Sequence, residues 1–357
     1  MIGIALAGWV PDYHVIVNAS PRPDRKGAVP SIRDVAAAAG VSHQTVSRVL
    51  NESPRVRPDT RAAVLAAIDR LGFRPNRAAR TLGFGRANGI TVVTSNTTLY
   101  GYARILQGIE EAARTEGVAL GIRVVESAEV RQTVDYVSDP SAGGLVVIAF
   151  DPLGTAVLEA LPAHIPAVVA AEPAAPDLGR VAIALDERRA AADATQHLLD
   201  LGHRTVHHVA IPSEGRAGGR HAGWRDALTQ AGAELPSALG CGWDIQSAYT
   251  AGRRLAEDPA VTAILCGNDD IAQGVRRALY DAGKDVPGDV SIVGFDDIPG
   301  SAFWTPALTT VRMDFAGLGR ACFHAAVAEL GGHPQPAISL APPRLIVRES
   351  TAPPRQQ

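Results

Sequence analysis

Residues 31–51 of the chain are SIRDVAAAAGVSHQTVSRVLN, and this segment alone predicts two short helices separated by a tight turn. Ser31 precedes the first helix, and Asp34 follows it at the spacing of a capping box. Gly40 ends that helix, and Ser42 caps a second one over residues 43–50. The first helix places four apolar residues on one face: Ile32, Val35, Ala36 and Ala39.

A third helix is predicted from Pro58-Asp59 to the glycine at position 72. Its apolar face is expected to carry Val64, Leu65, Ile68 and Leu71. Three short helices, of which the first two are joined by Gly40-Val41-Ser42, are typical of helix-turn-helix packing.

The second helix of this unit presents polar side chains at its start. Those expected to face outward are His43, Gln44, Ser47 and Arg48. Glutamine pairs with adenine and arginine with guanine through two hydrogen bonds each, and histidine donates or accepts. Such a helix suits the major groove of DNA, although a solvated polar helix face explains any one of these residues.

The charge of the chain is unevenly distributed. Residues 30–86 contain ten arginines and four acidic residues, a net charge of +6, whereas residues 87–357 contain 21 basic and 31 acidic residues, a net charge of −10. A basic module is expected of a polyanion binder because neutralised phosphates release their counterions. The charge pattern therefore favours a small nucleic-acid-binding unit attached to a larger acidic one.

The composition is that of an ordinary soluble chain, with 46% hydrophobic and 20% charged residues in 357. Three cysteines, Cys241, Cys266 and Cys322, without a Cys-x-x-Cys pair favour a reducing cytoplasm over a disulfide framework or a zinc site. The apolar run Met1–Val10 is about half as long as a membrane-spanning helix and lacks the features of a signal peptide. We expect residues 1–29 to be a disordered extension or an artefact of the assumed start of translation.

Beyond residue 88 the pattern changes to short β-branched runs alternating with amphipathic segments. The runs expected to be strands are Ile90–Val93, Val118–Val125, Gly144–Ile148, Ala167–Ala170, Val206–Ile211, Val261–Leu265 and Val290–Val293. Runs of this kind are typical of parallel strands buried on both faces. The predicted class is α/β, doubly wound, in two lobes, with a ligand site in the cleft beyond the carboxyl ends of the strands.

Taken together, the motifs resemble the lactose/galactose repressor (LacI/GalR) family over about residues 30–350. The resemblance begins with the segment quoted above and continues through Arg74–Leu82, which is similar to the family's hinge helix. In the large domain it rests on His221-Ala222-Gly223-Trp224, Cys266-Gly267-Asn268-Asp269-Asp270, Ser291–Asp297 and Pro306–Val311. It implies a DNA-binding head and a two-lobed effector domain like that of periplasmic binding proteins.

The resemblance assigns roles to residues of the head and hinge. His43, Gln44 and Arg48 would contact base edges, whereas phosphate contacts or helix caps are implied for Ser31, Ser42, Thr45, Ser47 and Asn51. Within the hinge and linker over residues 76–87, the hinge segment 76–82, with Asn76, would fold against DNA, and Leu82 would wedge into the minor groove. Separation of two such hinge helices by the effector would melt them and weaken operator binding.

The effector site implied by the resemblance contains Tyr102, Asp151, Arg220, Trp243, Asn268, Asp296 and Phe315. Carboxylate, guanidinium and amide groups beside an aromatic ring suit the hydroxyls and the apolar face of a sugar. The segment Leu99–Ala103 departs from the Asn-Pro-aromatic-aromatic run of many relatives, so the resemblance does not fix the identity of the ligand. Structural alternatives also stay open: Arg220 in an ion pair, Trp243 in the core, and Asp296-Asp297 capping a loop.

Two other classes of protein fit the sequence less well. For an enzyme, Gly83–Gly89 resembles a dinucleotide fingerprint but precedes a strand, and other catalytic motifs are missing, so we expect neither catalytic residues nor a cofactor. We expect His203, His207 and His208 to have surface or supporting roles and not to bind a metal. A periplasmic sugar-binding protein would require a secretory signal and no DNA-binding head.

The expected organisation is an extension over 1–29, a helix-turn-helix domain over 30–75, a hinge and linker over 76–87, an effector domain over 88–351 and a tail over 352–357. Because each head contacts one half-site of a palindromic operator, and the C-terminal residues show no heptads, we expect a homodimer and not a tetramer. The sign of the ligand's effect stays open, because one branch of the family uses a purine or another metabolite as a corepressor.

Overall fold

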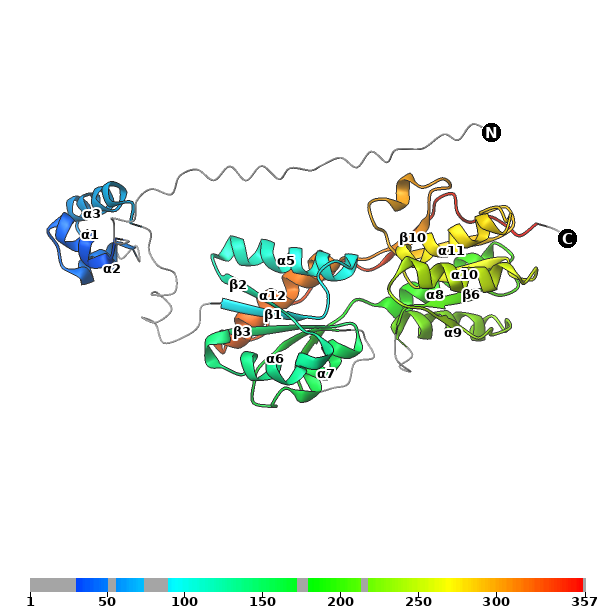
Figure 1. The fold of residues 1–357 in the computed structure, drawn as a ribbon, viewed down its shortest axis with the longest axis horizontal. Coiled ribbons are helices and arrows are strands. Elements are labelled where there is room, and N and C mark those ends of the chain that lie inside the picture. Colours follow the sequence, from blue (N-terminus) through cyan, green and yellow to red (C-terminus); the bar gives the residue numbers. More distant parts are fainter. Residues whose placement is uncertain (1–29, 51–55, 74–88, 172–178, 213–217, 356–357) are drawn as a thin grey trace, which may run out of the picture. The chain divides into compact units, whose positions relative to one another are not determined.

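The computed structural model describes residues 30–50, 56–73, 89–171, 179–212 and 218–355 (Figure 1). The chain divides into two compact units, Met1–Gly83 and Phe84–Gln357. The expected extension over 1–29, Asn51, and the hinge over 76–87 with Asn76 and Leu82 lie outside the described residues.

The first unit contains the three helices that the sequence predicts, α1 (Ile32–Ala39), α2 (His43–Leu50) and α3 (Pro58–Leu71). The capping box of α1 is present: the backbone N–H of Asp34 donates to Ser31 Oγ at 3.4 Å, and that of Ser31 donates to Asp34 Oδ2 at 2.7 Å. Gly40 and Gly72 end α1 and α3 in the left-handed conformation, with φ of 66° and 61°.

The core of this unit is small and aliphatic, formed by Val35, Ala36, Val46, Val49, Val64, Ala67 and Phe73. Ile68 and Leu71 pack against it, as expected of the third helix. The prediction for Leu65 is wrong, because its side chain is 49% exposed. Leu65 lies about 100° around the helix from Val64, so only one of the two can face this narrow core.

The second unit contains two α/β lobes. In the first lobe, the sheet order is β2-β1-β3-β4-β5 and all pairs are parallel. Its strands are β1 (Gly89–Thr94), β2 (Ala119–Val124), β3 (Gly144–Ala149), β4 (Val168–Ala171) and β5 (Val181–Ile183). Its helices are α5 (Tyr100–Glu116), α6 (Val130–Val137), α7 (Pro152–Ala160) and α12 (Phe315–Gly331), with the 3₁₀ turns η1 (Ser127–Glu129) and η2 (Pro140–Ala142).

In the second lobe, the sheet order is β11-β10-β9-β8-β6-β7. Its strands are β6 (His207–Ala210), β7 (Leu239–Gly240), β8 (Ala263–Cys266), β9 (Ser291–Asp296), β10 (Thr309–Arg312) and β11 (Arg344–Ile346). Its helices are α8 (Glu187–Asp200), α9 (Gly219–Gln230), α10 (Ile245–Ala256) and α11 (Asp269–Asp281), with the turn η3 (Ser301–Phe303). The expectation of parallel sheets is wrong for β11, which pairs antiparallel with β10.

The chain crosses between the lobes three times: after β5, before α12 and after α12. Helix α12 follows a strand of the second lobe but packs on α5 of the first. The two helices approach closely at Gly108 and Gly319, where an added Cβ would collide with the backbone oxygens of Ala316 and Ile105. This contact places Phe315, the first residue of α12, against the start of α5.

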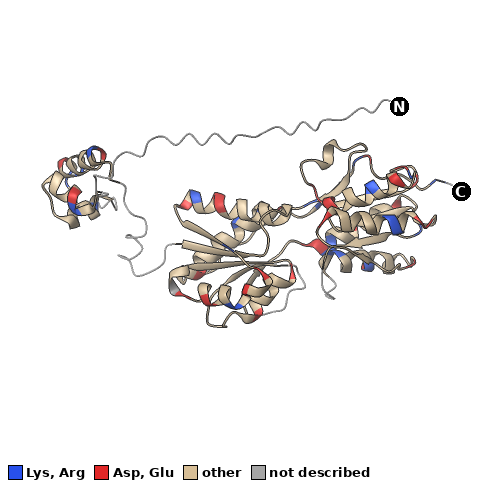
Figure 2. Ribbon diagram, in the orientation of Figure 1, with Lys and Arg blue, Asp and Glu red and all other residues tan. Residues whose placement is uncertain are grey.

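Charged residues lie mainly on the helices (Figure 2), and β1, β3, β4 and β8 contain none. These four strands are buried, as predicted, apart from half-buried Gly89 at the start of β1. The prediction of burial on both faces is wrong for β2, where Ile122 and Val124 are 51% and 44% exposed. Strand β2 lies at the edge of its sheet, where fewer elements cover it.

Candidate functional site

The exposed side of α2 carries the polar residues predicted to face outward. His43, Gln44 and Arg48 are exposed, and Ser47 is half-buried. Val46 and Val49, on the opposite side of the helix, are buried in the core of this unit. The helix is therefore anchored by its apolar face and presents donors and acceptors of hydrogen bonds on the other face.

Two of the residues predicted to contact phosphates or cap helices, Ser31 and Ser42, cap helices in the structure. Ser31 forms the capping box described above, and Ser42 Oγ accepts a hydrogen bond from the backbone N–H of Thr45 at 3.2 Å. The hydroxyls of Ser42 and Thr45 lie 2.9 Å apart. These contacts fix the start of α2 and leave the neighbouring side chains of His43 and Gln44 exposed.

A cavity of about 400 Å³, part of it open solvent, is lined by residues from both lobes of the second unit. Six of the seven predicted effector residues line it: Tyr102, Arg220, Trp243, Asn268, Asp296 and Phe315. The lining residues that sequence reasoning did not assign are Leu99, Tyr100, Gly101, Phe150, Glu187 and Ile211.

Aromatic rings form the wall of the cavity that comes from α5, α12 and the end of β3. The rings of Tyr100 and Phe315 meet edge to face with centroids 6.3 Å apart, and those of Tyr102 and Phe150 at 5.7 Å. Gly101 leaves room for this packing, because a Cβ there would lie only 3.2 Å from the Phe315 ring. Edge-to-face pairs of this kind hold rings in fixed orientations.

Asp151, the seventh predicted effector residue, does not line the cavity. It caps α7, where its Oδ1 accepts from the backbone N–H of Gly154 at 2.9 Å. Its Oδ2 accepts from the hydroxyls of Ser95 and Tyr102, the latter at 2.7 Å. The carboxylate of Asp151 therefore supports the Tyr102 ring from outside the cavity.

The opposite side of the cavity carries buried charges. Arg220 lies on α9 and is 7% exposed, and its Nη2 donates to Glu187 Oε1 at 2.9 Å and lies 3.2 Å from Asp296 Oδ1. Its Nη1 donates to the carbonyl of Gly267, and its guanidinium carbon lies 4.3 Å from the centroid of the Phe295 ring. The ion-pair alternative for Arg220 is thus present in the structure, within the lining of the cavity.

Asn268 precedes α11 and is 6% exposed. Its Oδ1 accepts from the backbone N–H of Ile271 at 2.8 Å, so the side chain caps the helix. This bond fixes the orientation of the amide and leaves its NH₂ group as the donor for a ligand.

Asp296 lies at the end of β9 in a strained conformation, with φ of 100°, and Asp297 follows with φ of 53°. Burial raises the pKa of Asp296 to about 6, and the neighbouring carboxylates of Glu187 and Asp270 act in the same direction against the opposing charge of Arg220. Positive φ values at residues other than glycine cost free energy and persist where the surroundings enforce them.

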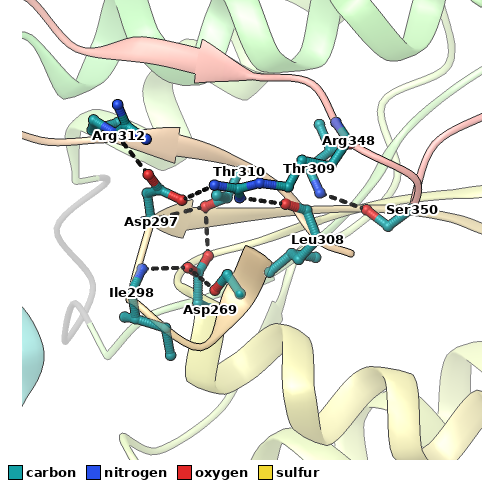
Figure 3. A network of polar contacts seen from close by, with 10 residues as sticks. Asp269, Asp297, Ile298, Leu308, Thr309, Thr310, Arg312, Arg348 and Ser350 are labelled. Carbon is teal, nitrogen blue, oxygen red and sulfur yellow. Dashed lines mark hydrogen bonds and ion pairs between the residues drawn. The ribbon is translucent and has the colours of Figure 1, made fainter. Parts of the chain in front are cut away.

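A network of polar contacts enforces this turn (Figure 3). Asp297 accepts from Arg312 Nε at 2.7 Å and from Arg348 Nη2 at 2.6 Å, so it turns away from the cavity that Asp296 lines. Buried Asp269 accepts from the backbone N–H of Ile298 at 2.9 Å and from the hydroxyl of Thr310 at 2.5 Å. Burial raises the pKa of Asp269 to about 7, against the effect of its hydrogen bonds.

Two of the three histidines expected in surface or supporting roles are buried. His203 lies within 3.2 Å of the hydroxyls of Thr262 and Ser291 and of the carbonyl of Ala352. His208 contacts the carbonyl of Leu265 at 2.9 Å, and burial lowers its pKa to about 4. The contact with Ala352 also fixes part of the expected C-terminal tail to the second lobe.

Within the described ranges, groups of three or more residues suited to holding a metal ion are not found. The described helices include none that is long and apolar enough to span a bilayer.

Comparisons with known proteins agree with this architecture. Residues 31–76 match the model of bacterial regulatory proteins of the lacI family, and residues 195–351 match a periplasmic binding protein-like domain. The chain is similar to the transcriptional regulator GalR of Escherichia coli (strain K12), with 31% identity over 331 residues, which cover 91% of this chain and 96% of GalR.

Among solved structures, the chain resembles the lac repressor dimer bound to operator and the anti-inducer ONPF, with a TM-score of 0.82, 29% identity and coverage of 91% of this chain and 100% of that chain. It also resembles the complex of the regulator CelR with cellobiose, with a TM-score of 0.66, 28% identity and coverage of 90% and 99%. The chain therefore belongs to the lacI family of bacterial regulatory proteins, which are ligand-responsive, DNA-binding transcription regulators.

Proposed function

We propose that this chain is a repressor that binds a palindromic operator as a homodimer and releases it when a sugar or sugar-like ligand occupies the cavity of the second unit. The observation that carries the proposal is the pairing, in one cavity, of Glu187, Arg220 and Asp296 with a wall of aromatic rings. Vicinal hydroxyls require such bidentate partners, and the apolar face of a sugar ring packs on aromatic groups.

The position of the cavity supports a small-molecule ligand, because such sites are concave and lie preferentially between domains or lobes. The relative CelR was solved with cellobiose, a sugar. Within this proposal Arg220, Asn268 and Asp296 bind hydroxyls, Trp243 and Phe315 provide apolar surface, and Asp151 acts through Tyr102.

On the DNA side, exposed His43, Gln44 and Arg48 contact base edges in the major groove. Residues 30–75 form the reading head and residues 76–87 the hinge, with Asn76 and Leu82 contributing to the interface and Leu82 acting as a minor-groove wedge. Each head reads one half-site, so the operator requires two chains. The lac repressor relative was solved as a dimer on its operator.

The proposed regulator acts in the cytoplasm and leaves its ligand chemically unchanged. The three cysteines are free thiols, and Cys266 and Cys322 are buried. These groups suit a reducing compartment. Recovery of unaltered sugar after incubation with the purified protein is the expected result.

The test is a titration of full-length protein on duplex DNA taken from upstream of its own gene, with shuffled DNA as the control. We expect specific binding at least about 10³-fold tighter than binding to shuffled DNA, followed by release when galactose, lactose or cellobiose is added. Equal binding to both duplexes at low and physiological salt would contradict the proposal.

A second candidate is a corepressor-dependent regulator whose ligand is a purine. The aromatic wall of Tyr102, Phe150 and Phe315 favours it, because a planar base also packs against rings. Tighter operator binding on addition of hypoxanthine or guanine, without an effect of sugars, would select this alternative.

A further inference from the structure

Glu187, which lines the cavity, occupies an unusual place for an acidic residue. It is the first residue of α8, where carboxylates ordinarily stay in solvent and interact with the helix dipole. The capping role belongs to the preceding Asp186, which accepts from the backbone N–H of Arg189 at 3.0 Å. The Glu187 side chain instead points inward and is 6% exposed.

The two oxygens of Glu187 have different surroundings. Oε1 accepts the hydrogen bond from Arg220 Nη2, whereas Oε2 is buried and has no hydrogen-bond donor among the described residues. The side chain of Asp296 is 9% exposed. Its Oδ1 lies 3.2 Å from the same Nη2 without the geometry of a hydrogen bond. One guanidinium group thus faces two carboxylates, and each of these two cavity-lining residues has one buried acceptor oxygen without a hydrogen-bond donor among the described residues.

This arrangement is costly for the ligand-free protein. A buried carboxylate oxygen without a donor loses its hydration, and the second carboxylate gives the cluster an excess negative charge. The same arrangement becomes favourable when a ligand supplies donors to both oxygens. Functional sites commonly retain such local costs.

We propose that Glu187 determines the specificity of the cavity: its Oε2, together with Asp296 Oδ1, accepts hydrogen bonds from adjacent hydroxyl or ammonium groups of the effector, and its charge excludes effectors with a phosphate or carboxylate at that position. This inference rests on the proposed function and narrows the effector to a neutral or amino sugar. Hydrogen bonds to a buried carboxylate are strong, and an anion beside two carboxylates is repelled.

The matched pair of variants is Glu187→Gln and Glu257→Gln. Glutamine keeps an acceptor for Arg220 and replaces Oε2 by a donor, so a residue that only holds Arg220 in place would tolerate it. Glu257 lies in the same lobe, is exposed and does not line the cavity. The probes are glucose, galactose, lactose, cellobiose and glucosamine, together with glucose 6-phosphate and gluconate, titrated calorimetrically into full-length protein.

We expect the wild type to bind at least one neutral or amino sugar and neither of the anions. Glu187→Gln should lower the affinity for that sugar by about 10- to 100-fold and reduce the preference for it over glucose 6-phosphate. Glu257→Gln should change neither the affinity nor the preference. Without ligand, Glu187→Gln should melt at the same temperature as the wild type or higher, because an excess buried charge is removed.

Three outcomes would overturn the inference. Equal sugar affinity in the wild type and Glu187→Gln would remove Glu187 from recognition and leave the proposed function standing. A melting temperature lower by more than about 5 °C, or failure of the variant to fold, would show that Glu187 serves stability. Binding of none of the probes by any variant would contradict the sugar effector itself.

Discussion

The outer face of α2 and the charged side of the cavity prepare polar groups for a ligand in opposite ways. His43, Gln44 and Arg48 are exposed, and the described residues form no hydrogen bonds or ion pairs with their side chains. Glu187, Arg220, Asn268 and Asp296 are each less than a tenth exposed and are held by defined partners.

The difference follows from the size of the partner. A rigid duplex covers a large area and orders exposed side chains as it binds, so those side chains need not be fixed beforehand. A small ligand offers few contacts, so its site must be organised before it arrives. Substitutions on α2 should therefore change binding without changing stability, whereas removal of the counter-charge in the cavity, as in Arg220→Ala, should change both.

The largest effect is expected for Arg220→Ala, which would leave Glu187 and Asp296 buried without their counter-charge. Loss of one partner of a buried ion pair costs about 3–5 kcal/mol, so we expect a loss of that size in the free energy of unfolding and no response to sugar. Urea unfolding followed by tryptophan fluorescence measures it. Exposed Arg225 on the same helix is the control, and Arg225→Ala should stay within about 0.5 kcal/mol of the wild type.

The next effect concerns pH and Asp296→Asn. The pKa of Asp296 is raised from 3.8 to about 6, mainly by burial, so its contribution to stability is present at low pH and is lost as pH rises through about 6. Asparagine does not titrate and tolerates positive φ. The free energy of unfolding of Asp296→Asn should therefore rise relative to that of the wild type by up to about 3 kcal/mol between pH 4 and pH 7. A difference that stays constant over this range would show that Asp296 is solvated.

Asp244 provides a control of opposite sign for the pH experiment. It caps α10, and its hydrogen bonds from Ser247 lower its pKa. The contribution of Asp244 to stability is therefore present at neutral pH and is lost as pH falls. The free energy of unfolding of Asp244→Asn should fall furthest below that of the wild type at neutral pH and least in acid. Unfolding scans run alongside those of Asp296→Asn measure it.

A smaller effect, on binding alone, is expected for Arg48→Ala. Removal of a bidentate contact with guanine should reduce discrimination at one base pair of each half-site by about 1–3 kcal/mol, with an unchanged melting temperature. Fluorescence anisotropy on operator variants measures it. Equal weakening on operator and shuffled DNA would place Arg48 on a phosphate instead.

The smallest effect is expected for Ser31→Ala. Loss of the capping box should cost the first unit about 1 kcal/mol and weaken all duplexes alike. Ser31→Thr keeps the hydroxyl and should restore stability in thermal melts. If both variants keep full stability but bind DNA poorly, Ser31 contacts phosphate directly and its cap is unimportant.

Elements with strong local signals were predictable from the sequence. Ser31, Gly40, Ser42 and Gly72 mark the ends of the head helices, and the structure confirms all four positions. The buried strands β1, β3 and β8 were found within one or two residues of their ends. Strands β5, β7, β10 and β11 were missed because they have only two to four residues each, too few for a period to emerge.

The site was only partly predictable for a different reason. Glu187 at the start of a helix has the sequence pattern of an ordinary favourable dipole interaction, and only the fold shows that its side chain turns inward. Asp151 directly follows Phe150, which lines the cavity, but the hydrogen bonds that Asp151 accepts from Tyr102 and Gly154 hold its carboxylate behind the lining. Burial and hydrogen-bond partners are set by tertiary packing, which local sequence does not encode.

The three crossings between the lobes have an evolutionary consequence. The described helices of the head all lie within residues 32–71, so a single recombination event could transplant the DNA reader onto another body. Neither lobe is continuous in sequence, since α12 of the first lobe is encoded between β10 and β11 of the second. One crossover can therefore exchange the head or the two-lobed body as a whole, but it cannot exchange a single lobe, so the two walls of the cavity are inherited together.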